Sequence, residues 1–88
     1  MMIDEVYSEG FTAGAKLMMA HHELSRRGIH YGQEVRFPVV ALLDDLRQVI
    51  LPYVSAADNE EPVDVDELIN TIDSFLHGVN SGLFEHNY

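Results

Sequence analysis

Residues 4–27 read DEVYSEGFTAGAKLMMAHHELSRR and organise the first part of the chain. Apolar side chains recur there at steps of three and four, which predicts a helix over about 4–27. Asp4 and Glu5 suit the positive end of a helix dipole, and Arg26 and Arg27 suit its negative end. Gly28 follows directly, where a left-handed residue commonly ends a helix.

Two glycines, Gly10 and Gly14, lie four residues apart inside this predicted helix. Such spacing places both on one face and lets another helix backbone approach closely. Each glycine costs about 1 kcal/mol relative to alanine in a helix, so we expect close packing to compensate. Two partners remain open, namely helix 38–51 of the same chain or the same helix of a second copy. We take Gly10, Gly14 and the adaptable side chain of Met18 as candidates for self-association.

A second helix is predicted over about 38–51 because Pro38 suits a first helical position and an apolar face follows it. Pro52 lacks a backbone N–H group, so we expect the helix to end near Leu51 or to kink there. The polar residues 55–63 are then expected to form an acidic, exposed loop.

A third helix is predicted over about 64–77, with Asp64 and Glu67 forming a capping box. We expect Gly78 or the cluster Asn80-Ser81-Gly82 to end it. Its expected buried side comprises Val65, Leu68, Ile69, Ile72, Phe75, Leu76 and Val79. The chain is therefore interpreted as one all-α domain over 1–88, a small bundle of three main helices that dimerisation completes.

Charge is distributed unevenly along these 88 residues. The net charge is −10, and neither Lys nor Arg occurs after Arg47. This distribution opposes direct contact with nucleic acid or anionic membranes, and it favours either solubility or docking on a basic surface. The candidate partner-binding residues are the five acids Glu60, Glu61, Asp64, Asp66 and Glu67.

The function expected from these features is that of a non-enzymatic, homodimeric interaction module that docks on a protein partner through its acids. One alternative is inhibition of a nuclease or another basic nucleic-acid-binding protein, in which carboxylates imitate the spacing of DNA phosphates. The simplest alternative is that the acids only keep a loop solvated.

Catalytic and metal chemistry has little support in the sequence. The chain has no cysteine, so it offers neither a thiol nucleophile nor a thiolate metal site. His21 and His22 are adjacent, and neighbouring helical side chains point about 100° apart, which disfavours a shared ion. We expect no metal and no cofactor. The remaining alternative, a metal-binding or enzymatic helical protein, needs His21 or His22 to meet distant carboxylates.

The first residues, MMIDE, lack the basic and apolar segments of a secretory signal. The longest near-apolar run, Val39 to Leu43, is far shorter than the roughly 20 residues that cross a bilayer. A cytoplasmic protein is therefore expected.

Overall fold

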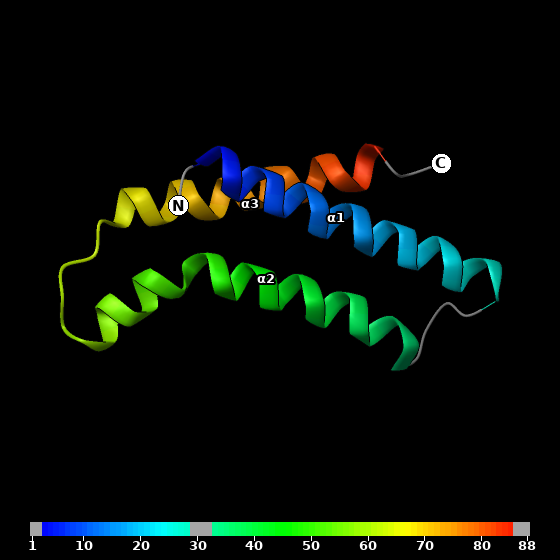
Figure 1. The fold of residues 1–88 in the computed structure, drawn as a ribbon, viewed down its shortest axis with the longest axis horizontal. Coiled ribbons are helices and arrows are strands. Elements are labelled where there is room, and N and C mark those ends of the chain that lie inside the picture. Colours follow the sequence, from blue (N-terminus) through cyan, green and yellow to red (C-terminus); the bar gives the residue numbers. More distant parts are fainter. Residues whose placement is uncertain (1–2, 29–32, 86–88) are drawn as a thin grey trace.

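The computed structural model describes residues 3–28 and 33–85, and this part of the chain forms three helices and no strand. They are α1 (Ile3–Arg26), α2 (Gln33–Asp58) and α3 (Val65–Glu85). Helices α1 and α3 run side by side in the same direction, and α2 runs back beneath them (Figure 1). The predicted all-α bundle is confirmed.

Helix α1 has the bounds predicted for it to within one residue. Gly28 follows it with a φ of 76°, and its N–H donates to the carbonyl of Ser25 over 3.0 Å. A left-handed residue at this point closes the helix end because glycine takes positive φ without a steric penalty.

Helix α2 is longer than the predicted 38–51, since it begins at Gln33 and continues to Asp58. Pro52 lies within it and is exposed. A proline removes one helical hydrogen bond, and on the exposed side water can solvate the carbonyl that loses its donor. The helix therefore bends toward its C-terminal end instead of stopping (Figure 1). The connection to α3 shortens to residues 59–64.

Helix α3 also passes the predicted end at residue 77 and continues to Glu85. Gly78 and Gly82 are helical and buried there, so neither acts as a cap. A glycine ends a helix when it takes the left-handed conformation. Where a glycine is present because a neighbouring backbone needs the space, it can keep the helical conformation.

The four helical glycines bring the backbones of α1 and α3 into contact. A Cβ atom on Gly10 would overlap the backbone carbonyl of Phe75, and one on Gly14 would overlap that of Val79. From the other side, a Cβ on Gly78 would lie 2.8 Å from the backbone nitrogen of Phe11. The close approach predicted for Gly10 and Gly14 is therefore present. Its partner is α3, which is neither of the two helices considered from the sequence.

The apolar core is small and lies mainly between α1 and α3. Its buried members among the described residues are Val6, Ala13, Val49, Phe75 and Val79. Only Val49 comes from α2, and Leu42, Leu46, Ile50 and Leu83 pack around the cluster while partly exposed. Helix α2 is thus held less firmly than the α1–α3 pair.

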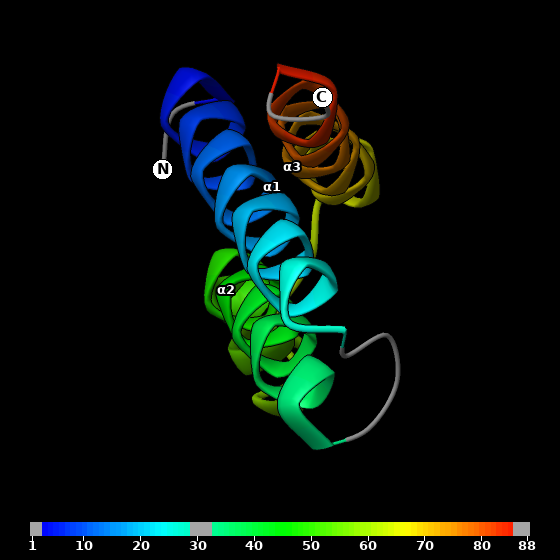
Figure 2. The same cartoon turned by 90° about the vertical axis from the view of Figure 1, so that its right-hand side faces the viewer.

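Much of the apolar side predicted for α3 is not covered. Val65 is 60% exposed, Ile69 50% and Leu76 45%. They were predicted to be buried, but α1 approaches α3 along the glycine side and covers only part of the apolar arc. In the end-on view, α1 contacts both other helices and one flank of α3 stays open (Figure 2).

Candidate functional site

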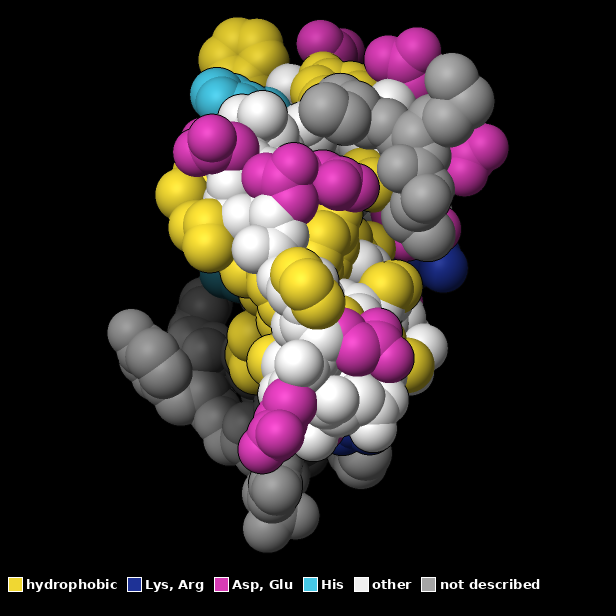
Figure 3. Space-filling view, turned by 90° about the vertical axis from the view of Figure 1, so that its left-hand side faces the viewer, with side chains coloured by type: hydrophobic (Ala, Val, Ile, Leu, Met, Phe, Trp, Pro, Cys, Tyr) yellow, Lys and Arg dark blue, Asp and Glu magenta, His cyan; other side chains and the backbone are white. Residues whose placement is uncertain are grey.

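The five predicted partner-binding acids lie together at one end of the bundle, on the connection between α2 and α3 and the first turn of α3. We call residues 59–67 the acidic turn. Figure 3 looks onto this end and shows acidic side chains spread over it, with basic ones only at its margins. The structure thus gathers Glu60, Glu61, Asp64, Asp66 and Glu67 into one region.

The C-terminal cap of α2 sets the direction of the first two acids. The N–H of Glu61 donates to the carbonyl of Ala56 over 2.8 Å, and that of Glu60 donates to Ala57 over 3.1 Å. This pair of bonds is a Schellman motif, which requires a left-handed residue, and Glu60 takes that role with a φ of 59°. Both side chains are exposed.

Asp64 caps α3. Its Oδ1 accepts the N–H of Glu67 over 3.1 Å, which is the first half of the predicted capping box. The Glu67 carboxylate accepts the Tyr53 hydroxyl over 3.0 Å instead of returning to the cap. Asp64 and Glu67 therefore have structural tasks, whereas Glu60, Glu61 and Asp66 remain in solvent.

Thr71 completes this network between α2 and α3. Its hydroxyl donates to the backbone carbonyl of Glu67 over 2.8 Å and lies 3.1 Å from the hydroxyl of Tyr53. Thr71 is buried, so these contacts satisfy its polar atom. A hollow of about 320 Å³ adjoins the network, with Pro52, Tyr53, Asp64 and Glu67 in its lining.

The candidates for self-association lie elsewhere on the molecule. Gly10 and Gly14 are buried beneath α3, and Met18 is half-buried on α1. Because the backbone of α3 already occupies the glycine face, a second copy has no access to it in this fold.

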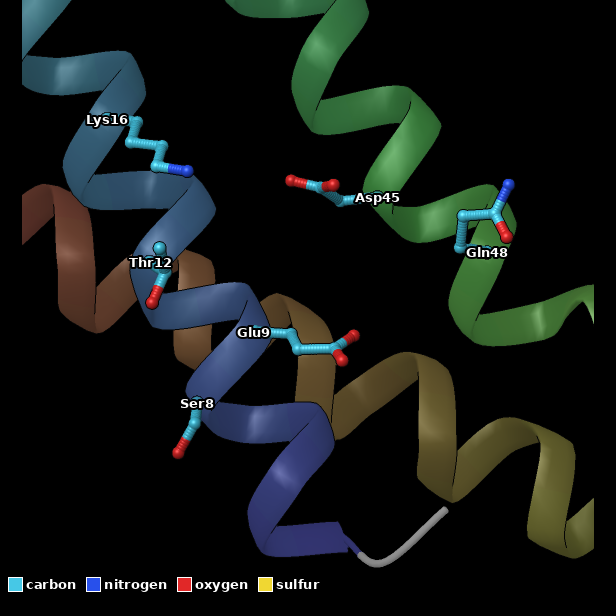
Figure 4. A pocket seen from close by; sticks show the side chains of 6 residues that line it. All are labelled: Ser8, Glu9, Thr12, Lys16, Asp45 and Gln48. Carbon is cyan, nitrogen blue, oxygen red and sulfur yellow. The ribbon is translucent and has the colours of Figure 1, made fainter.

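A polar hollow of about 400 Å³ between α1 and α2 was not predicted (Figure 4). Lys16, the sole lysine of the chain, extends from α1 toward α2, and Asp45 of α2 points back toward it (Figure 4). Glu9, Thr12 and Gln48 line the hollow, and the hydroxyl of Ser8 turns away. In the sequence, the spacing of Glu9, Thr12 and Lys16 places three polar side chains on one helical face, and this pattern could have indicated the hollow. The lining thus combines hydroxyl and amino groups with carboxylates, and no hydrogen bond or ion pair joins them within the described residues.

The histidines form no metal centre within the described residues. The rings of His21 and His22 lie 5.9 Å apart and are tilted by 49°. In residues 3–28 and 33–85, no three His, Asp or Glu side chains come close enough together to hold an ion. His30 and His86 lie outside the described residues.

None of the described helices combines the length and apolar character needed to cross a membrane.

Comparison with protein families, curated proteins and solved structures found no match.

Proposed function

We propose that this protein is a non-enzymatic interaction module that acts as a homodimer and binds a basic surface of another protein through the acidic turn. One observation carries the proposal. Glu60, Glu61 and Asp66 are exposed together, and none of them forms an ion pair within the described residues. No Lys or Arg follows Arg47 in the sequence to neutralise them.

Like charges held this close repel one another, and a cationic partner relieves the repulsion. Complementary charge mainly accelerates association and selects the partner, and its effect weakens as salt screens it. Proteins that bind nucleic acids carry basic surfaces of this kind, so they are the partner class that we propose. In such a complex the carboxylates would occupy positions that phosphates otherwise take.

A charge-neutralisation experiment tests the role of the acidic turn. We would replace Glu60→Gln, Glu61→Gln and Asp66→Asn together, because this set spares the cap at Asp64 and the bond from Tyr53 to Glu67. A matched control carries Glu9→Gln, Asp44→Asn and Asp73→Asn, which removes the same charge from exposed positions elsewhere. Titration with a fluorescent oligolysine peptide at several salt concentrations gives the affinity.

We expect the turn variant to bind about tenfold more weakly at low salt, since three exposed charges contribute up to roughly 0.5 kcal/mol each. The control should lose less than half the binding free energy that the turn variant loses. Its affinity for the peptide should still fall as salt is added. Equal losses in both variants would mean that total charge, and not the acidic turn, attracts the peptide.

A further inference from the structure

The apolar residues along one side of α3 follow a regular spacing. Val65, Ile69, Ile72, Leu76 and Leu83 form what we call the α3 stripe, with the buried Val79 in the same register. Steps of four and three are the spacing by which one helix packs along another over several turns. Val65, Ile69 and Leu76 are about half exposed or more, while Ile72 and Leu83 are partly covered.

Helix α2 also carries exposed apolar residues. Val39, Leu43 and Val54 are each more than 40% exposed. Figure 3 shows apolar side chains gathered along the left flank of the molecule, from α3 above to α2 below. A connected apolar surface on a small, highly charged protein marks an interaction site.

The total exposed area shows that the chain is less compact than a typical monomer of its mass. The chain exposes 6385 Å², whereas a compact monomer of 9.9 kDa is expected to expose about 5,200 Å². The excess of about 1,200 Å² exceeds the roughly 800 Å² that each partner buries in a stable complex. The surface that the fold leaves uncovered, of which the α3 stripe is one part, is therefore of the order that a stable dimer buries.

Charge decides which partner suits this surface. The acids Asp66, Glu67 and Asp73 lie at other helical positions, so the α3 stripe is free of charge. A basic partner would find no carboxylate on the stripe to pair with. A second copy would bring an identical uncharged stripe, and a two-fold axis allows the same patch to serve both sides.

We propose that two copies of the chain pack their α3 stripes against each other in antiparallel orientation, and this inference rests on the homodimer of the proposed function. A parallel pair would bring two acidic turns together, where like charges repel. The antiparallel pair places one acidic turn at each end of the dimer. Each dimer then presents two separate sites for basic partners.

The mass in solution tests the interface. The wild-type chain should have twice its 9.9 kDa mass by light scattering. A variant with Ile69→Glu and Leu76→Glu should be a monomer with unchanged helical circular dichroism, because both side chains are at least 45% exposed in the single chain. Met19→Glu, at a 58% exposed apolar position of α1, is the control and should remain dimeric. If helicity is lost, Ile69→Gln with Leu76→Gln replaces the glutamate pair.

Spin labels on single cysteines test the orientation, which is convenient because the chain has no cysteine of its own. In an antiparallel pair centred near residue 74, labels at Leu76→Cys lie close together. Labels at Val65→Cys are separated by about 27 Å along the helix axis, given a rise of 1.5 Å per residue. Short distances at both positions would mean a parallel pair and would overturn the proposed orientation.

The experiments distinguish a wrong dimer interface from a wrong binding role for the acidic turn. The triple variant of Glu60, Glu61 and Asp66 should bind oligolysine weakly while its mass stays that of a dimer. The stripe variant Ile69→Gln with Leu76→Gln, which adds no charge, should be monomeric while each chain binds oligolysine as before. A monomeric wild type, a dimeric stripe variant or a monomeric Met19→Glu variant would each overturn the proposed dimer interface.

Discussion

Glu60 has a backbone conformation that costs a non-glycine residue free energy. Its φ is 59°, and no other non-glycine residue in the described part of the chain has a positive φ. The left-handed region is unfavourable by roughly 1–2 kcal/mol for a side chain with a Cβ atom. Glycine is the usual residue at this position of a Schellman motif.

Glu60→Gly should therefore stabilise the fold. We expect a gain of about 0.5–1 kcal/mol, because relief of the left-handed strain exceeds the added entropy of the unfolded chain. Thermal unfolding followed by circular dichroism measures it, and the midpoint should rise by several degrees.

Two controls separate backbone strain from charge in that experiment. Glu60→Gln removes the charge but keeps the strain, so its midpoint should rise less. Glu61→Gly places glycine where φ is not positive and should not stabilise. A larger gain from the glutamine than from the glycine would reject the strain explanation.

At the scale of elements, the contact between α1 and α3 depends on the absence of side chains. Gly10 and Gly14 on α1 face Phe75 and Val79, while Gly78 and Gly82 admit the backbone of α1. The hydroxyl of Tyr7 adds a bond of 2.8 Å to Ser81 along the same contact. Backbone contact over this length gives the pair its close van der Waals packing.

Gly78→Ala should destabilise the protein by about 2 kcal/mol, although alanine favours helices by about 1 kcal/mol over glycine. The reason is that the added methyl group meets backbone atoms of α1, which cannot move aside as a flexible side chain could. Chemical denaturation measures the loss. Asn80→Ala, at an exposed position of the same helix, should instead be neutral or slightly stabilising. Equal effects of the two substitutions would contradict the packing explanation.

The helices themselves could be predicted from the sequence because apolar periodicity determines them. The ends of the helices are harder to predict from the sequence, because Pro52 and Gly78 break a helix only in some surroundings. The exposed side of α2 tolerates the proline, and the contact with α1 requires the glycine. The spacing of Gly10 and Gly14 showed that a backbone would approach but held no information on which helix would supply it.

At the scale of the whole molecule, the described helices form an elongated body. Its Cα atoms extend over 49 × 25 × 14 Å, and its radius of gyration of 15.0 Å exceeds the roughly 12 Å expected for 88 compact residues. Clustering of the acids at one end could be predicted from their adjacency in sequence. The polar hollow around Lys16 and Asp45 could not, because it depends on how α1 and α2 are placed relative to each other.

A net charge of −10 on such a body predicts that salt stabilises it. We expect the unfolding midpoint to rise between low and physiological ionic strength, because screening weakens the repulsion within the folded state. The triple variant Glu60→Gln, Glu61→Gln and Asp66→Asn should show a smaller rise. A midpoint that falls with added salt would contradict dominant self-repulsion.

The pairing of α1 with α3 also determines when the chain can fold during its synthesis. Helix α1 leaves the ribosome before α3, its closest partner, and the whole of α2 with two connections lies between them. Contacts between such distant segments must close a long loop before they stabilise anything, which slows folding. Until α3 emerges, the glycine face of α1 has no helix to cover it. We therefore expect α1 and α3 to pair only after Gly82 has emerged from the ribosome.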